Sequence, residues 1–149
     1  MKIIISAIGK FAKNSAEYKI IQEYITRIPW NITIKEFEVK NVNNVKNKEA
    51  ELLLKSIDKN YKKIVLDEKG KMFSSNEFAK FMSNIQLQEN KLAFIIGGAY
   101  GHSAQVINQA DHVISLSKMT FTHIMVRIFL VEQIYRSYTI NTNHPYHKI

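Results

Sequence analysis

Leu92-Ala-Phe-Ile-Ile-Gly-Gly-Ala-Tyr-Gly101 joins a short apolar run to a glycine-rich turn. The apolar run predicts a buried strand, and the residues Ser103–Ala110 predict a short helix directly after the turn. Strand, glycine turn and helix in this order are typical of an α/β protein with a parallel sheet. Glycines let a ligand approach the backbone, and a helix N-terminus offers free N–H groups. The alternative is a tight turn that needs only a positive φ.

The spacing of these glycines excludes two nucleotide-binding motifs. Gly97-Gly98-x-x-Gly101 differs from the G-x-G-x-x-G fingerprint of dinucleotide-binding proteins, and it follows the fourth predicted strand rather than the first. The sequence also contains no G-x-x-x-x-G-K-[ST] motif, which excludes a P-loop nucleotidase.

Hydrophobic periodicity predicts five strands that alternate with five helices. The predicted strands cover Lys2–Ile8, Ile32–Val39, Lys63–Leu66, Leu92–Ile96 and His112–Leu116. The predicted helices cover Tyr18–Ile28, Ala50–Ile57, Phe78–Ile85, Ser103–Ala110 and Thr122–Tyr138. Because the links are short and no linker divides the chain, we expect one α/β domain over residues 1–149. Its sheet should be mostly parallel, with helices on both faces.

Local signals mark the ends of several elements. Pro29 stops the first helix, and Ser74 with Glu77 fits a capping box for the third. A change of apolar phase between Ile34 and Phe37 indicates a bulge or a strand end. By composition, two segments are expected to be irregular: a polar connection, Asn41–Asn47, and a turn, Asp67–Lys71.

The last predicted helix, Thr122–Tyr138, is apolar around nearly its whole circumference. Such a helix is buried on more than one side. In a small domain we therefore expect the core on one face and a partner subunit on another. Glu132 and Arg136 are four residues apart and are expected to pair within the helix.

Length and composition set the class of protein. The chain has 149 residues, of which 46% are hydrophobic and 23% charged, and this suits one compact globular domain. No apolar run reaches the ~18 residues of a membrane span, and Met1–Ile5 is too short for a secretory signal. The absence of cysteine excludes a disulfide scaffold, a thiolate zinc site and a cysteine nucleophile. We expect a cytoplasmic protein without a membrane segment.

The net charge is +8, from 21 Lys and Arg against 13 Asp and Glu. An excess of this size favours a polyanionic partner such as RNA or DNA. Because 18 of the 21 are Lys, biased codon usage is an alternative explanation. Residues 1–63 carry a net +6, whereas all five His and two of the three Arg lie after residue 100. The side chains suited to chemistry therefore gather near the C-terminal end.

Two groups in this region could form a site. Leu116–Phe121 is uncharged apart from Lys118 and joins a strand to the last helix. At the carboxyl ends of parallel strands it suits a small-molecule pocket; the alternative is a plain connection whose Met and Phe join the core. His123 and Arg127 share a helical face, and burying either one requires partners. They either contact an anion or substrate, or form a structural polar network.

The tail Asn143-His-Pro-Tyr-His-Lys148 combines two His, one Tyr and one Lys. Aromatic rings stack on bases and cations contact phosphates, so the tail is a candidate RNA contact; the alternative is a frayed end. Metal binding has little support because His144 and His147 lack a third ligand at a suitable spacing. We therefore predict no metal site.

Taken together, these motifs resemble one known family. They are Leu66–Lys71, Phe94–Gly101, Leu116–Phe121 with His123, Val126-Arg127, Glu132–Arg136 and His144–Lys148. In this order and at this spacing they are similar to the bacterial ribosomal RNA large subunit methyltransferase H family, which belongs to the SPOUT superfamily. The resemblance extends over the whole chain.

The resemblance implies a fold and an activity that composition and periodicity do not show. The fold would be a SPOUT domain with a C-terminal trefoil knot, and the assembly would be a homodimer. The activity would be the transfer of a methyl group from S-adenosylmethionine to N3 of pseudouridine 1915 in 23S rRNA, on the assembled ribosome.

The resemblance also implies the roles of individual residues. The methyl donor would bind to Leu66, Gly97 and Gly98, and to Leu116, Ser117, Lys118, Met119, Thr120 and Phe121 of the loop. The catalytic candidates are His123 and Arg127. The RNA would contact Arg136, His144, Tyr146, His147 and Lys148.

Two residues depart from the family pattern. Family members usually carry an acidic or amide residue where Tyr100 stands, and Pro where Thr122 precedes His123. Tyr100 cannot replace a carboxylate base at neutral pH, so the identity of the general base stays open, with His123 as the first candidate.

Two other classes of function also stay open. One is a noncatalytic ribosome-binding module with this fold, and the other is a Rossmann-like enzyme for a small anionic metabolite. The intact Gly97-Gly98 pair and the Leu116–Phe121 loop argue against the first, because a decayed enzyme should lose them early. The tail and the basic excess argue against the second.

Overall fold

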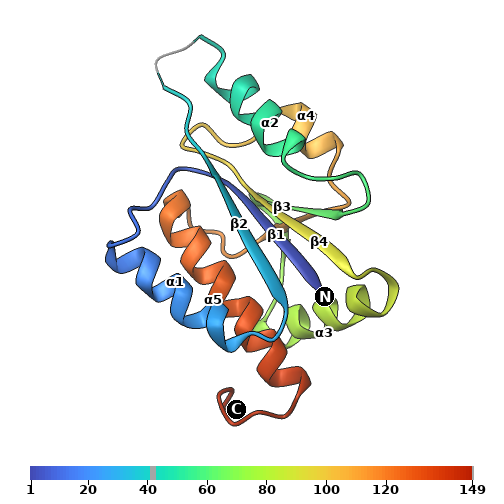
Figure 1. Ribbon diagram of the computed structural model, residues 1–149. Helices are drawn as coiled ribbons and strands as arrows, with labels where there is room; N and C mark the ends of the chain where they lie inside the picture. The colour runs from blue at the N-terminus through green and yellow to red at the C-terminus, as the bar shows by residue number, and fades with distance from the viewer. Residues whose placement is uncertain (41–42, 149) are drawn as a thin grey trace.

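A parallel sheet runs through the middle of the computed structural model, which describes residues 1–40 and 43–148 (Figure 1). Its strands are β1 (Lys2–Ile8), β2 (Asn31–Phe37), β3 (Lys62–Met72), β4 (Lys91–Ile96) and β5 (His112–Ser115). They lie in the order β2-β1-β4-β3-β5, and every neighbouring pair is parallel. The prediction of an α/β protein with a mostly parallel sheet is confirmed. All five carboxyl ends point toward the same edge, where ligands of such sheets bind.

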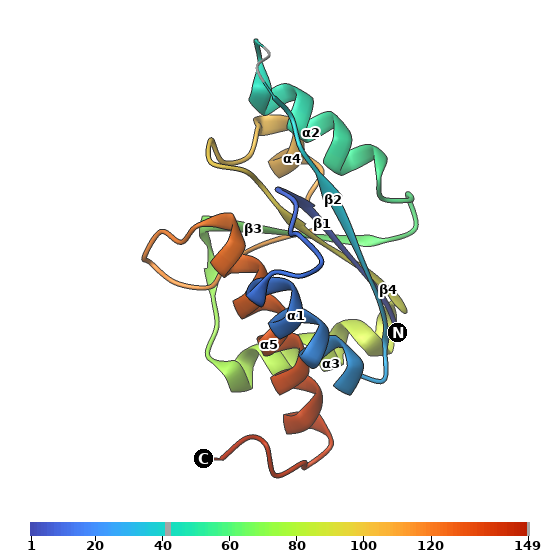
Figure 2. The ribbon, with the colours of Figure 1, turned by 60° about the vertical axis from the view of Figure 1, so that its left-hand side comes forward.

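Helices cover both faces of the sheet, as predicted (Figure 2). The helices are α1 (Ala16–Arg27), α2 (Val45–Lys55), α3 (Ser75–Gln88), α4 (Ala104–Asn108) and α5 (His123–Asn141). Alternate residues of β1 enter two separate cores because side chains alternate along a strand. Ile3 and Ile5 pack with α1, α3 and α5, whereas Ile4 and Ile8 pack with α2 and α4.

Most of the local signals in the sequence are confirmed. Ser74 and Glu77 form both bonds of a capping box, and α1 ends at Arg27, before Pro29. The phase change after Ile34 marks a strand end, because β2 stops at Phe37 and its register with β1 has no bulge. In the predicted connection Asn41–Asn47, α2 already begins at Val45, and residues 41–42 lie outside the described residues.

The predicted turn at Asp67–Lys71 is wrong, because β3 continues through it to Met72. The register with β5 shifts between Leu66 and Lys71, so that Ile114 pairs with both residues. A Cβ on Gly70 would lie 2.5 Å from the carbonyl carbon of Ile114. Turn-like composition here marks a bulge in a strand, which needs a glycine because another backbone passes close by.

The last helix is longer than predicted, since α5 continues for three residues beyond Tyr138. Thr122 is its N-cap and accepts a hydrogen bond from the backbone N–H of Met125 at 3.4 Å, which satisfies one free donor of the first turn. α5 packs against α1 and α3, with Leu130, Val131 and Ile134 fully buried. No helix in the described part of the chain is long and apolar enough to cross a membrane.

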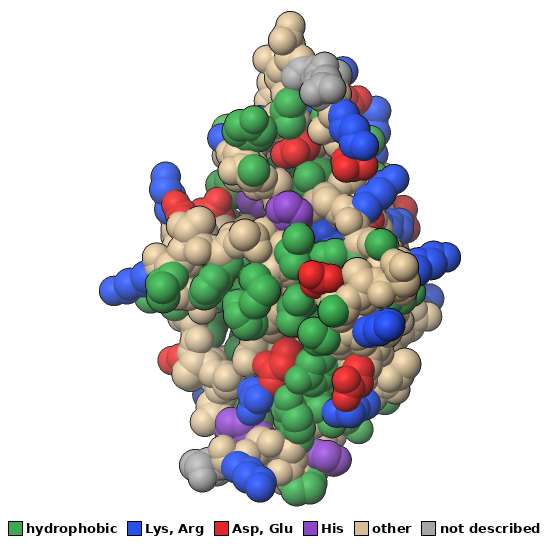
Figure 3. Space-filling model, turned by 90° about the vertical axis from the view of Figure 1, so that its left-hand side faces the viewer, with side chains coloured by type: hydrophobic (Ala, Val, Ile, Leu, Met, Phe, Trp, Pro, Cys, Tyr) green, Lys and Arg blue, Asp and Glu red, His purple; other side chains and the backbone are tan. Residues whose placement is uncertain are grey.

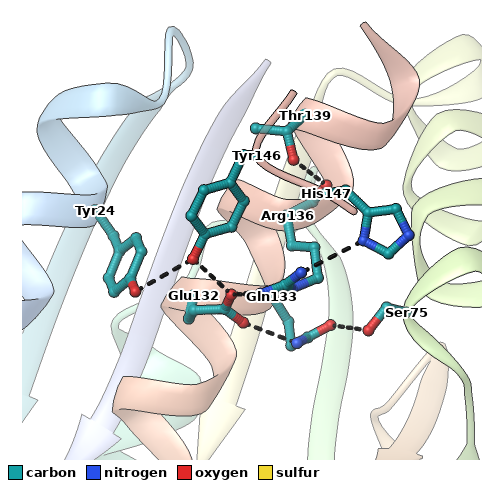
Figure 4. A network of polar contacts seen from close by, with 8 residues as sticks. All are labelled: Tyr24, Ser75, Glu132, Gln133, Arg136, Thr139, Tyr146 and His147. Atoms are coloured by element: carbon teal, nitrogen blue, oxygen red, sulfur yellow. Dashed lines mark hydrogen bonds and ion pairs between the residues drawn. The ribbon is translucent and has the colours of Figure 1, made fainter. Parts of the chain in front are cut away.

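The C-terminal tail folds back onto α5, so the alternative of a frayed end is wrong for the tail around Tyr146 (Figure 4). The ring of Tyr146 packs edge-on against Tyr135, with 4.7 Å between centroids, and its hydroxyl donates to Glu132 Oε1 at 3.0 Å. The guanidinium of Arg136 lies 4.9 Å from the centre of the same ring and pairs with Glu132 at 2.6 Å. The predicted Glu132–Arg136 pair is therefore confirmed.

The close approach of β5 to Gly70 predicts a stability effect. Gly70→Ala should lower the free energy of unfolding by about 1–3 kcal/mol, because the new methyl group overlaps the Ile114 backbone. Lys69→Ala, at an exposed neighbouring position, is the matched control and should change it by less than about 0.5 kcal/mol. Urea unfolding followed by circular dichroism measures both values, and equal midpoints for the two variants would contradict this account.

Candidate functional site

A cleft of about 800 Å³ opens at the carboxyl ends of β3, β4 and β5. Its volume falls within the range of roughly 300–1,000 Å³ that is typical of small-molecule sites. The cleft is lined by the predicted donor-site residues Leu66, Gly97, Gly98, Leu116, Ser117, Met119, Thr120 and Phe121. Lys118 is exposed and is the one member of that predicted set that does not line the cleft. Tyr100 lines the cleft and is 70% exposed.

Two positions of the glycine turn require glycine because neighbouring side chains pack closely, and not because φ is positive. A Cβ on Gly98 would lie 2.7 Å from Glu49 Oε1, and one on Gly97 would lie 3.1 Å from the ring of His102. Of the three glycines in the turn, only Gly101 has a positive φ, at 72°. The alternative of a turn that merely needs positive φ therefore applies to Gly101, whereas Gly97 and Gly98 present bare backbone to the cleft.

The loop after β5 is held in place by its own polar side chains. Ser115 Oγ donates to the carbonyl of Ser117 at 2.7 Å, and Ser117 Oγ accepts from the N–H of Met119 at 3.0 Å. Thr120 Oγ1 donates to Glu68 Oε2 at 2.9 Å, which ties the loop to the bulge of β3. Met119 is 71% exposed, so the alternative in which this methionine joins the core is wrong.

His123 is the first residue of α5 and lines the cleft. Gly9, at the end of β1, faces its ring so closely that a Cβ there would lie 2.5 Å from His123 Nε2. Partial burial, followed by the positive charge of Arg127, lowers the pKa of His123 below its ordinary value. At neutral pH the imidazole is therefore uncharged, and one ring nitrogen can accept a proton.

Arg127 lies behind His123 and has no exposed side-chain surface. Its Nη2 donates to the carbonyls of Ile8 and Gly9 at 3.1 and 3.0 Å, and its Nη1 lies 3.5 Å from Glu36 Oε2. The guanidinium carbon also lies 4.2 Å from the centre of the Phe11 ring. Arg127 thus has carbonyl partners for Nη2 and an ion pair with Glu36, whereas its buried Nε and Nη1 make no hydrogen bond among the described residues.

Three of the predicted RNA-contacting residues, Arg136, Tyr146 and His147, lie together toward the other end of α5 (Figure 4). Arg136 Nη1 lies 3.4 Å from His147 Nδ1, and Tyr146 packs between α5 and Tyr24. His144 and Lys148 are exposed. Arg136 comes thirteen positions after His123, which amounts to about 20 Å along a helix. One chain therefore does not bring the tail and the cleft together.

Two residues of the site were missed by sequence reasoning. His102 follows Gly101 directly, and its place after a predicted strand–turn–helix junction was a usable signal. Glu49 belongs to α2, and its side chain is buried beneath Gly98 although the two residues are far apart in the sequence. Nothing in the periodicity of α2 distinguishes this glutamate from a solvent-exposed one. In residues 1–40 and 43–148, no group of three or more His, Asp or Glu could hold a metal ion.

One face of the molecule carries a band of hydrophobic side chains across its middle, with charged residues around it (Figure 3).

The exposed part of α5 includes Met125 and Phe129, which are 39% and 37% exposed and lie four residues apart on one side of the helix. Phe129 also contacts Phe121 of the cleft loop, with 5.2 Å between ring centroids. The prediction that α5 is apolar beyond the side facing the core therefore agrees with the structure.

Comparison with known proteins identifies the family. Residues 1–147 match the family described as "Predicted SPOUT methyltransferase". The ribosomal RNA large subunit methyltransferase H of Halothermothrix orenii is 41% identical and covers 99% of this chain and 100% of its own length. The protein of that name from Christiangramia forsetii is 42% identical with 99% coverage of both chains, and that from Clostridioides difficile is 42% identical over 95% of this chain and 88% of its own.

A solved structure shows the same fold at low sequence identity. A probable methylase family protein from Haemophilus influenzae superposes with a TM-score of 0.58 at 11% identity, covering 99% of this chain and 70% of that one. The fold, the full-length family match and the relatives agree with one another. The chain belongs to the SPOUT methyltransferases and, within them, to the ribosomal RNA large subunit methyltransferase H family.

Proposed function

We propose that this protein transfers a methyl group from S-adenosylmethionine to N3 of pseudouridine 1915 in 23S rRNA of the assembled ribosome, in the cytoplasm. The observation that carries the proposal is the cleft that the Gly97-Gly98 backbone and the Leu116–Phe121 loop form together. This cleft occurs in a chain that is 41–42% identical to ribosomal RNA large subunit methyltransferase H proteins over nearly its full length.

The cleft fits the methyl donor in size and in chemistry. Leu66, Leu116 and Phe121 offer apolar walls for an adenine, while Gly97 and Gly98 leave backbone that a ligand can approach. When bound, S-adenosylmethionine supplies an electrophilic methyl group on its sulfonium. Lys118 is exposed and does not line the cleft, so its side chain is available to RNA phosphates rather than to the donor.

His123 is the candidate catalytic residue for the proton. The N3–H of pseudouridine is a weakly acidic imide, and its proton must leave when the nitrogen takes up a methyl group. The uncharged imidazole of His123 lines the same cleft and can accept that proton. Arg127 acts as a positioning residue: it fixes the end of β1 through Ile8 and Gly9, against which His123 packs.

The distance between the two ends of α5 favours a homodimer. If the tail of one protomer lies at the cleft of the other, the tail and the cleft can contact the same nucleotide, although the two ends of α5 lie about 20 Å apart within one chain. The exposed Met125 and Phe129 on α5, beside Phe121, offer an apolar surface for a second copy. The dimer would complete each site with the tail of its partner.

We infer that the chain also forms the trefoil knot of its family. Ile114 pairs with β3 on both sides of the bulge, so the loop after β5 leaves the sheet beside the segment that connects β3 to β4. α5 then lies on the face that α3 also covers. This arrangement suits a chain end that has passed through the preceding loop.

The proposal predicts methyl transfer to ribosomal RNA. The protein should be incubated with labelled S-adenosylmethionine and with ribosomes that lack the modification, and the labelled nucleotide should then be mapped. Label at N3 of pseudouridine 1915 in the large-subunit RNA is the expected result. Donor binding without any transfer would indicate a noncatalytic ribosome-binding module, and transfer to a small metabolite would indicate an enzyme of another class.

Substitution of His123 tests the assignment of the proton acceptor. His123→Ala should reduce methyl transfer by at least about a hundredfold, because general-base catalysis typically contributes 10²–10⁴-fold. Its affinity for S-adenosylhomocysteine, measured by calorimetry, should stay close to that of the unmodified protein. Retained turnover in the variant would exclude His123 as the base.

Mixed dimers test whether two protomers share each site. His123→Ala and a His147→Ala/Lys148→Ala double variant should each be inactive alone, while Tyr146 still anchors the tail. Random mixing gives half heterodimers with one complete site each, so about a quarter of the full activity should return. No recovery, with heterodimers confirmed by native mass spectrometry, would contradict shared sites, and a monomer at micromolar concentration would contradict the dimer itself.

A further inference from the structure

His102 occupies a position in the cleft that the proposed reaction leaves unassigned. It follows the glycine turn directly and precedes α4, and its side chain lines the cleft. The ring lies between the end of β3 and the end of β4: Nε2 is 3.0 Å from the carbonyl oxygen of Leu66, and three ring atoms would lie 3.1–3.3 Å from a Cβ on Gly97. Both neighbours belong to the proposed donor site.

The contact with Leu66 determines which ring nitrogen carries the proton. A carbonyl oxygen can only accept a hydrogen bond, so Nε2 must be the donor. In an uncharged imidazole, Nδ1 is then an unprotonated acceptor. His102 Nδ1 is buried and has no hydrogen-bond partner among the described residues. A buried acceptor without a partner is unusual in a folded protein, and His102 lines a ligand cleft. A ligand can therefore supply the missing donor once a small shift of the ring exposes Nδ1.

The surroundings of His102 keep its ring uncharged near neutral pH. Burial lowers the pKa of His102, and the positive charge of Lys46 on α2 acts in the same direction. The Leu66 carbonyl and Asp67, both on β3, oppose this shift but do not cancel it. Glu49 is the other titratable group of α2 near the glycine turn. Its carboxylate lies against Gly98, whereas the ring of His102 lies against Gly97. The acceptor at Nδ1 is therefore present at pH 7 and is lost when the ring is protonated in acid.

We propose that His102 is a specificity-determining residue of the donor site, whose Nδ1 accepts a hydrogen bond from an N–H or O–H group of S-adenosylmethionine. This inference rests on the proposed function, because it takes the cleft to be the donor site. In the adenosyl part of the ligand, the adenine amine and the ribose hydroxyls can donate such a bond while the apolar walls hold its rings. Through Nε2, the same ring fixes the end of β3 at Leu66.

A purely structural role for His102 makes a different prediction. A ring that only fills the space above Gly97 could be replaced by Leu, which is apolar and of similar reach. His102→Leu removes the acceptor and keeps most of the volume, whereas His102→Asn places an amide oxygen near the position of Nδ1. The two variants therefore separate the loss of an acceptor from the loss of packing.

Calorimetric titration with S-adenosylhomocysteine tests the proposal without any turnover. At about pH 7.5, His102→Leu should bind about tenfold more weakly than the unmodified protein, and His102→Asn should stay within about threefold of it. Between about pH 7.5 and about pH 5, the unmodified protein should lose affinity as the ring becomes protonated, while His102→Leu should show less of this loss. Thermal unfolding of both variants checks that they are folded.

Two analogues identify the group that donates the bond. S-inosylhomocysteine replaces the adenine amine with a carbonyl, and a 2′-deoxy analogue removes one ribose hydroxyl. The unmodified protein should bind one of the analogues more weakly than S-adenosylhomocysteine, whereas His102→Leu should bind that analogue and S-adenosylhomocysteine equally well. The group that this analogue lacks is the partner of Nδ1. Equal affinity of His102→Leu and the unmodified protein at both pH values would overturn the role of His102 and leave the donor site intact. No binding by the folded, unmodified protein would overturn the donor site as well.

Discussion

Ile114 lies opposite two residues of β3 at once, Leu66 and Lys71, and this double contact fixes the position of everything that follows it in the chain. It is possible because Gly70 has no side chain to hold the β5 backbone away. The loop that leaves β5 is thereby held against the β3 bulge, where Thr120 bonds to Glu68. The cleft, the start of α5 and the place of His123 all depend on this approach.

Glycines shape the rest of the site in a consistent way. Three of them lie just beyond the ends of β1 and β4. Each one faces a titratable side chain, which comes from a distant segment for two of them and from the residue after the turn for the third. Gly9 faces His123, Gly97 faces His102, and Gly98 faces Glu49. A methyl group at any of these positions would displace a side chain whose protonation is altered by burial. The sheet edge thus sets both the shape of the cleft and the charge of its histidines.

The elements that repeat a simple pattern could be predicted from the sequence. Short apolar runs identify all five strands, and the Ser74–Glu77 capping box and the Glu132–Arg136 pair appear as expected because both depend on residues three or four apart. The order of the motifs also predicted which residues form the loop beside the cleft. The site residues that could be predicted are therefore those that lie on the loops.

Contacts between distant segments could not be predicted in this way. Asp67–Lys71 has the composition of a turn, and only the passage of β5 shows that it is a strand with a bulge. The partners of Arg127 come from β1 and β2, more than ninety residues earlier in the chain. The return of the tail onto α5, where Tyr146 contacts Glu132 and Tyr24, likewise depends on contacts that the spacing of the motifs does not reveal.

The central claim is that the cleft between the glycine turn and the Leu116–Phe121 loop holds the methyl donor with His123 beside the methyl-accepting base. A crystal structure of the protein with S-adenosylhomocysteine tests it most directly. The account predicts the adenosyl group between Leu66 and the loop, next to the Gly97-Gly98 backbone, with the sulfur on the side of the cleft that His123 lines. A ligand bound at another surface, or one whose sulfur lies on the side away from His123, would contradict it.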